Sequence, residues 1–166
     1  MDIKKPNDIQ VGIHVESKQA ICDQRILHVA SDIAGWSKNR KRKVGCVITN
    51  DRGDVVSTGC NGFPRGIDDN IEERHISPLK HLFVEHAERN AIYNAAAAGS
   101  AVRDCTLYST LYPCAECAKA IIQSSIKRLV TYPPDWDDKR YKESFAVSKQ
   151  MFDEVGIEIT FYDVPQ

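Results

Sequence analysis

Two short clusters of polar residues, 28 positions apart, constrain the fold of this chain more than any other feature. The first is His86-Ala87-Glu88 and the second is Pro113-Cys114-Ala115-Glu116-Cys117. One imidazole and two thiolates supply three of the four ligands of a tetrahedral zinc ion, and the fourth position stays open for water. The fold must therefore bring His86, Cys114 and Cys117 to one point, with Glu88 beside them.

The carboxylate gives this arrangement its chemistry. Zinc makes a water molecule acidic near neutral pH, and a neighbouring carboxylate such as Glu88 can take its proton and pass it on. His86 and Glu88 are two positions apart on an expected helix, so they point in different directions and suit different roles. The Cys-x-x-Cys spacing places Cys114 and Cys117 on the first turn of a helix, where the helix dipole favours thiolates. The order H-x-E followed by P-C-x-x-C is typical of zinc-dependent base deaminases.

Length and charge exclude other classes. At 166 residues the chain has the size of one domain, and its net charge of −1 gives no reason to expect binding to long nucleic acid. It contains no apolar run of about 20 residues for a membrane span and no apolar signal core near the N-terminus, so we expect a cytoplasmic protein with reduced thiols. The remaining cysteines are predicted to be small buried residues: Cys22, Cys46, Cys60 and Cys105.

Hydrophobic periodicity predicts an α/β domain over residues 17–166, preceded by a loose arm over 1–16. The pattern favours helices over 17–36, 86–98, 114–124 and 141–155, and strands over 44–49, 54–60, 106–110, 128–132 and 157–162. A long polar segment, 67–85, separates the expected hairpin from the histidine cluster. Alternation of strands and helices implies a mixed sheet with parallel crossovers and helices on both faces.

The sequence resembles the cytidine and deoxycytidylate deaminase superfamily, most closely its deoxycytidylate (dCMP) branch. The resemblance runs from about Lys38 to Val130, and its matching stretches are Lys43–Ile48, Gly59–Gly66, His86–Ile92 and Pro113–Ile122. It implies a three-layer α-β-α fold with a five-stranded mixed sheet. It also implies one catalytic Zn²⁺ per subunit on His86, Cys114 and Cys117, with Glu88 as the proton shuttle.

The implied reaction is the hydrolytic deamination of dCMP to dUMP and ammonia, in a homo-oligomer that dCTP and dTTP can regulate. Asn61 stands in the family's Asn-Gly-x-Pro position and is expected to bind the substrate. The full set of expected substrate contacts is Asn61, Ala87, Tyr112, Pro113, Arg65 and Lys43. Lys43 belongs to a basic cluster over 38–43 that suits either a phosphate or a solvated loop. Tyr112 suits either stacking on a base or packing in the core.

Other functions share these motifs. A deaminase of another nucleoside, nucleotide or base, such as cytidine, guanine or a modified pyrimidine, would need the same metal site. A non-catalytic, zinc-bound nucleotide-binding module is a further alternative, but it would have no use for Glu88. A purely structural zinc would need a fourth protein ligand, for which His75 and His81 in the polar segment are the nearest histidines. That segment has no cysteine, so we do not expect a second zinc.

Overall fold

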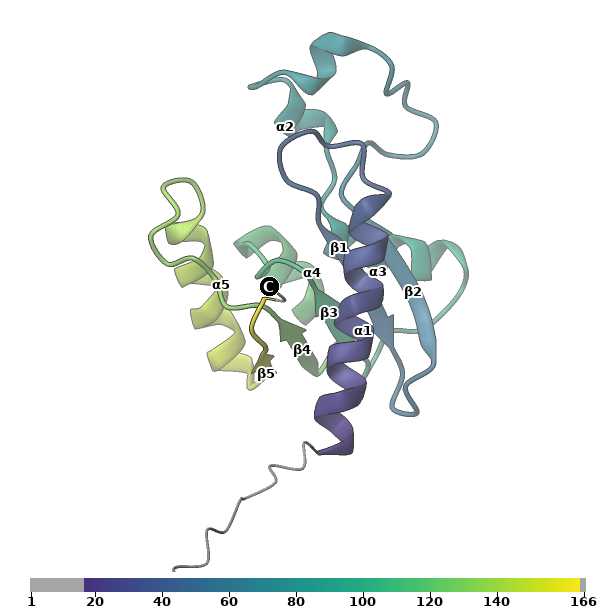
Figure 1. Cartoon of the computed structure of the whole chain (residues 1–166), viewed down its shortest axis with the longest axis vertical. Helices are drawn as coiled ribbons and strands as arrows, with labels where there is room; N and C mark the ends of the chain where they lie inside the picture. Colours follow the sequence, from purple (N-terminus) through teal and green to yellow (C-terminus); the bar gives the residue numbers. More distant parts are fainter. Residues whose placement is uncertain (1–16, 165–166) are drawn as a thin grey trace, which may run out of the picture.

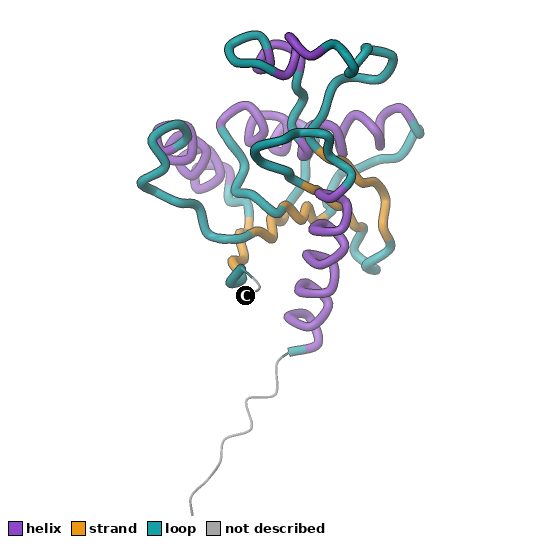
Figure 2. The backbone as a smooth tube through the Cα atoms, turned by 45° about the horizontal axis from the view of Figure 1, so that its top comes forward, coloured by secondary structure: helices purple, strands orange, loops and turns teal. Residues whose placement is uncertain are grey.

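A five-stranded sheet between two layers of helices forms the centre of the protein. The computed structural model describes residues 17–164, so the arm expected over 1–16 lies outside the described residues. The strand order is β2-β1-β3-β4-β5. Helix α1 crosses one face of the sheet, and α3, α4 and α5 cover the other (Figure 1; Figure 2, where the strands run across the middle). The predicted three-layer α/β fold is confirmed.

The elements begin and end close to their predicted positions. The helices are α1 (Lys18–Gly35), α3 (Ala87–Ala97), α4 (Ala115–Gln123) and α5 (Lys142–Val155), and the strands are β1 (Gly45–Thr49), β2 (Val55–Cys60), β3 (Thr106–Ser109), β4 (Arg128–Thr131) and β5 (Glu158–Phe161). Residue chemistry explains the ends. The Ser17 side chain caps α1 by accepting from the Ala20 N–H at 3.1 Å, and Gly156 ends α5 in the left-handed conformation.

The pairing of the strands explains their nearly continuous apolar sequences. β1 runs antiparallel to β2 and β3, whereas β3, β4 and β5 are parallel and are joined by α4 and α5. Both faces of the central strands are buried, so neighbouring residues enter opposite cores. The core beneath α1 contains Leu27, Val47, Tyr108 and Val130. The core beneath the other helices contains Cys46, Ile48, Leu107 and Leu129.

Two strand glycines allow the helices to lie directly on the sheet. A Cβ atom at Gly45 would lie 1.9 Å from the Ala30 carbonyl oxygen of α1, and one at Gly59 would lie 2.4 Å from the Ala91 nitrogen of α3. No side chain fits at either place without displacing helix backbone. The backbone contact at Gly59 holds the first turns of α3 against β2, and α3 begins directly after His86.

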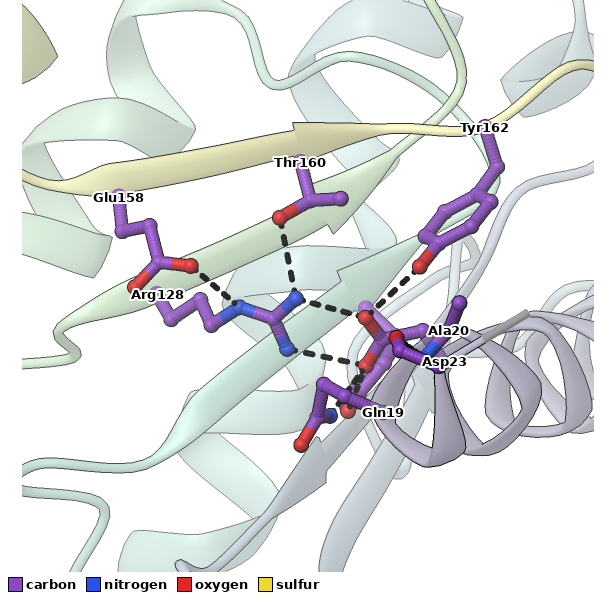
Figure 3. Close-up of polar contacts among 9 residues, drawn as sticks. Gln19, Ala20, Asp23, Arg128, Glu158, Thr160 and Tyr162 are labelled. Carbon is purple, nitrogen blue, oxygen red and sulfur yellow. Dashed lines mark hydrogen bonds and ion pairs between the residues drawn. The ribbon is translucent and has the colours of Figure 1, made fainter. Parts of the chain in front are cut away.

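A buried ion pair fastens α1 to β4 (Figure 3). The Asp23 carboxylate is fully buried and accepts from both terminal nitrogens of Arg128 on β4, at 2.9 and 2.6 Å. The hydroxyls of Tyr108 and Tyr162 donate to the same carboxylate at 2.9 and 3.1 Å. The guanidinium also donates to Thr160 at 3.0 Å, so α1, β3, β4 and β5 meet at one polar cluster.

The long polar segment belongs to an insert, residues 62–85, that projects above the sheet (top of Figure 1). It contains only two single turns, η1 (Glu72–His75) and α2 (Lys80–Phe83). Its interior is aromatic, because the Phe63 ring stacks on His75 at 4.9 Å and meets Phe83 at 5.6 Å. Paired backbone hydrogen bonds between Gly62 and Glu85 join the two ends of the insert.

Two exposures were not as the sequence suggested. Cys46 and Cys105 are buried and Cys60 is half-buried, but Cys22 lies on the exposed side of α1, so the prediction of a buried Cys22 is wrong. The hydrophobic periodicity of α1 did not separate the two positions, because Cys22 is directly followed by the buried Asp23. No helix within residues 17–164 combines the length and the apolar character needed to cross a membrane.

Candidate active site

His86, Cys114 and Cys117 converge between the starts of two packed helices. His86 is the N-cap residue of α3, Cys114 is the N-cap residue of α4, and Cys117 follows on the first turn of α4. The Nδ1 atom of His86 lies 3.4 Å from each of the two sulfurs. The three ligand atoms all lie within 4.8 Å of one another, and within residues 17–164 this is the group that could hold a metal ion. Because zinc–ligand bonds are about 2.0–2.3 Å long, one ion fits among these atoms.

The two thiols are electrostatically unequal. The pKa of Cys114 is lowered to about 4, first because the Cys117 thiol donates to its sulfur and also because His86 does so. The same contact with Cys114, together with burial, raises the pKa of Cys117 well above its ordinary value. The low pKa favours the thiolate form of Cys114, which is the form in which a cysteine binds a metal ion.

Glu88 lies beside the metal ligands in a dry position. It is 3% exposed, and one carboxylate oxygen lies 3.5 Å from the Cys117 sulfur. The Ser109 hydroxyl, at the end of β3, donates weakly to the other oxygen at 3.4 Å. Burial is the main reason that the pKa of Glu88 is raised above its ordinary value. A carboxylate with a raised pKa in such a place is suited to taking and returning a proton near neutral pH.

Neighbouring side chains hold the two helix starts in place. The Ser144 hydroxyl of α5 accepts from the Ala115 N–H at 2.8 Å, which satisfies one of the free N–H groups at the start of α4. On the other helix, Glu85 accepts from the His86 N–H at 2.8 Å and pairs with Arg89 at 2.5 Å. The ligand positions are therefore fixed by hydrogen bonds as well as by packing.

A cavity of about 400 Å³ opens from the metal ligands. His86, Glu88 and Cys114 form part of its lining, together with residues from three connections. These connections are the α1–β1 loop, the insert over 62–85 and the β4–α5 loop over 132–141. A small polar molecule with one apolar face could occupy this space, since apolar side chains such as Val44, Leu111 and Phe145 also line it.

The structure brings some of the predicted substrate contacts to this cavity and not others. Asn61, Ala87 and Tyr112 line it. Lys43 does not, because its ammonium donates to the Gly35 carbonyl at 3.3 Å, and Arg65 instead donates to Asn94 at 2.8 Å. Pro113 is also not part of the lining, although it directly precedes Cys114.

Asn61 and Tyr112 have structural partners of their own. Asn61 accepts from the Val44 N–H at 2.8 Å and donates to the Arg42 carbonyl at 2.9 Å, so its side chain fastens the end of the α1–β1 loop to the residue that follows β2. The Tyr112 ring is 1% exposed and contacts Phe145 edge-on at 5.5 Å. Of the two roles open to Tyr112, packing is the one that these contacts favour.

Several cavity residues were not singled out as substrate contacts from the sequence. They are Asn39, Lys41, Arg42, Lys80, His81, Asp138, Arg140 and Tyr141. Each lies in a segment that the sequence marks as unusual: the basic loop, the long insert and the Pro-rich loop after β4. Their meeting at one cavity depends on contacts between distant segments, such as the 3.1 Å ion pair between Arg42 and Asp138.

Comparison with known proteins settles the family. The model of the cytidine and deoxycytidylate deaminase zinc-binding region matches residues 20–132, which is more than half of the chain. The chain belongs to the cytidine and deoxycytidylate deaminase family. A probable deoxycytidylate deaminase of Caenorhabditis elegans is 37% identical over 86% of this chain and 71% of its own length. The deoxycytidylate deaminase of Pongo abelii is 34% identical over 73% of this chain and 68% of its own length.

The fold agrees with this membership in the deaminase family. The dCMP deaminase of cyanophage S-TIM5, solved in complex with dCMP and dUMP, superposes with a TM-score of 0.70 at 25% identity, covering 89% of this chain and 100% of the phage protein. The family model and the donor set of one imidazole and two cysteine sulfurs identify the cofactor as zinc. The zinc predicted from the sequence is thus confirmed.

Proposed function

We propose that this protein catalyses the zinc-dependent hydrolytic deamination of dCMP to dUMP and ammonia. The observation that carries the proposal is the position of Glu88, a buried carboxylate 3.5 Å from a metal-ligating sulfur at the floor of an open cavity. A structural metal site has no use for such a group. The relatives named above support the choice of dCMP among the cytosine compounds.

The residues of this chain divide the work. Zinc, when bound, supplies a Lewis acid that makes water a nucleophile at neutral pH. Glu88 takes one proton of the attacking water and delivers it to N3 of the cytosine ring while the water oxygen bonds to C4. It then takes the proton that remains on this oxygen and delivers it to the amino group, which leaves as ammonia as the C4–N bond breaks and the C4 carbonyl forms. His86, Cys114 and Cys117 would hold the metal, and the burial of Glu88 leaves only a small part of its side chain in contact with solvent. Ala87 forms part of the cavity lining.

Three further features are included in the proposal on the strength of family resemblance. They are assembly as a homo-oligomer, regulation by dCTP and dTTP, and a cytoplasmic location. The resemblance places the effector response near Asn61–Gly66, which leads from β2 into the insert. Light scattering and activity measurements with each effector would test the first two features.

The test of the reaction is ammonia release from dCMP, deoxycytidine, CMP and dCTP in parallel, with the Glu88→Gln variant as the control. We expect turnover of dCMP by the wild-type protein and a loss of at least about 100-fold in Glu88→Gln, with zinc content unchanged. Zinc-loaded protein that releases ammonia from none of these compounds would contradict the proposal. Purine and modified-base substrates would then be tried, and a binding module would be the remaining reading.

A further inference from the structure

Ser109, the last residue of β3, lies in the core beside the carboxylate of Glu88. It is 0% exposed, and in the sheet it pairs with Cys46 of β1, which is also fully buried. A hydroxyl group in such a place needs a hydrogen-bond partner, because burial without one is unfavourable. The Ser109 hydroxyl has its acceptor in Oε1 of Glu88, at 3.4 Å. Ser109 therefore belongs to the surroundings of Glu88, although it does not line the cavity within the described residues.

The main chain after β3 sets the direction in which this hydroxyl donates. The Leu111 N–H donates to the Ser109 oxygen at 3.4 Å. A serine hydroxyl has a single proton to donate, and it turns away from an N–H group that approaches the oxygen. The proton of Ser109 is thus directed toward Glu88. Leu111 lies three positions before Cys114, so the same short segment carries a metal ligand and orients the hydroxyl.

The two oxygens of the Glu88 carboxylate have different neighbours. Oε1 accepts from the Ser109 hydroxyl, whereas Oε2 accepts from the Cys117 thiol at 3.5 Å. A cysteine binds a metal ion as the thiolate, which has no proton to donate. In the metal-loaded protein Oε2 therefore loses the Cys117 donor, while Oε1 keeps the Ser109 hydroxyl.

The other polar group of the sheet near Glu88 is a poor substitute for Ser109. Burial raises the pKa of the Cys46 thiol, and the charge of Glu88 raises it further, which shows that Cys46 also lies near the carboxylate. A thiol is a weak hydrogen-bond donor compared with a hydroxyl. Of this cross-strand pair, Ser109 is the residue able to hold one carboxylate oxygen.

We propose that Ser109 is a positioning residue for the deamination: its hydroxyl holds Oε1 of Glu88, so that Oε2 is the oxygen that carries the proton. The inference rests on the proposed function, since it concerns the two proton transfers described there. In each transfer Oε2 takes a proton from the attacking oxygen and gives it up again, first to N3 and then to the departing amino group, so the carboxylate ends unchanged. Without the hydroxyl, the carboxylate can rotate about its last side-chain bond, and the proton-carrying oxygen loses its fixed position.

The first test compares Ser109→Thr with Ser109→Val, two side chains of the same shape that differ in the hydroxyl group. The single-turnover rate constant for dCMP, and the dCMP concentration that half-saturates it, are measured for each variant. We expect Ser109→Val to lower the rate constant about 10-fold at an unchanged half-saturating concentration, and Ser109→Thr to stay within about 3-fold of the wild type.

Ser57→Ala is the control for a general loss of stability. Ser57 is another buried strand serine, and its hydroxyl donates to the main-chain carbonyl of Ala91 on α3 at 2.7 Å. The Ser57→Ala variant should have a lower melting temperature and an unchanged rate constant. Equal rate constants in Ser109→Thr and Ser109→Val, or an equal loss in Ser57→Ala, would overturn the proposal.

A second measurement separates failure of this contact from failure of the proposed function. Zinc-loaded Ser109→Thr and Ser109→Val proteins are unfolded in urea, each alone and combined with Glu88→Met, which removes the acceptor. With Glu88 present we expect the higher urea midpoint for Ser109→Thr, and we expect Glu88→Met to abolish this advantage. If no cytosine compound is a substrate, the comparison still decides whether the hydroxyl bonds to Glu88. The same midpoint difference with and without Glu88 would exclude the contact and the role built on it.

Discussion

Asp23 of α1 and Arg128 of β4, 105 positions apart in the chain, form an ion pair with two hydrogen bonds. The Asp23 side of this pair is fully buried. The carboxylate is 0% exposed and the Arg128 side chain is 12% exposed. A buried pair of this kind is costly to break, because removing one partner leaves the other charge uncompensated. The pair also sets the position of α1, whose C-terminal end leads into a loop of the active-site cavity.

We expect the Asp23→Asn variant to lose about 3–5 kcal/mol of unfolding free energy, since it leaves the Arg128 guanidinium without its counter-charge. Urea denaturation followed by circular dichroism measures the change. Asp153→Asn is the matched control, because the exposed pair between Lys149 and Asp153 contributes less than about 1 kcal/mol. Similar losses of unfolding free energy in the two variants would show that the buried ion pair stabilises the fold no more than the exposed pair does.

The same carboxylate gives the protein a specific sensitivity to acid. Burial raises the pKa of Asp23, but hydrogen bonds from Arg128, Gln19 and Tyr108 outweigh that effect and leave the pKa below its ordinary value. A lowered folded-state pKa stabilises the fold above the unfolded-state value of about 4, and this stability is lost as the pH falls through the folded-state pKa. We therefore expect the stability advantage of the wild type over Asp23→Asn to shrink below about pH 4. Urea midpoints between pH 7 and pH 2.5 test this, and a constant difference would contradict it.

Alanine substitutions at Gly59 and at Gly35 are expected to have opposite effects, because only the first would bring a new Cβ atom against another element. Gly59→Ala would place a Cβ atom 2.4 Å from the Ala91 nitrogen, so α3 must move away from β2 and carry His86 with it. We expect a loss of about 1–3 kcal/mol in stability together with weaker zinc binding. Gly35→Ala, at the exposed end of α1 with nothing within 4 Å of the new atom, should be neutral or stabilising by up to about 1 kcal/mol. Zinc affinity and urea midpoints of both variants check the contrast.

Asn61 is expected to act on substrate binding partly through the loop that it fastens. Asn61→Ala removes the hydrogen bonds to Val44 and Arg42, which frees the loop carrying Lys41. We expect a loss of about 1–3 kcal/mol in stability and a rise in KM larger than the fall in kcat. Asn94→Ala is the control, because Asn94 donates to the Thr58 carbonyl at 2.7 Å outside the cavity. It should lower stability without raising KM, and an equal rise in KM would contradict a role for Asn61 in the loop.

Much of this fold can be predicted from short stretches of the sequence. Ser17 and Gly156 mark helix ends by their capping chemistry, and buried parallel strands produce continuous apolar runs. The metal ligands could also be predicted, because spacing alone fixes that Cys114 and Cys117 share a helix turn. These features depend on residues a few positions apart, so they can be recognised without knowing the fold.

The features that escaped prediction depend on contacts between distant segments. The exposed Cys22 and the buried Asp23 are neighbours on α1, and only the position of Arg128 explains why the charged residue is the one inside. Lys43 belongs to the basic loop, yet it turns toward Gly35, whereas Lys41 from the same loop reaches the cavity. Lys80 and Arg140 reach the cavity only when the insert and the loop before α5 fold over the metal ligands.

The zinc ligands and Glu88 stand at or near the first turns of two helices packed in the core, whereas the wall facing them is built from three surface connections. The residues that carry out the reaction and the residues that line the rest of the cavity therefore lie on different segments of this chain. Connections tolerate exchange and changes in length far better than core helices do. Mutation could redirect such a protein toward another cytosine derivative by rebuilding the connections, with the reaction centre carried over intact.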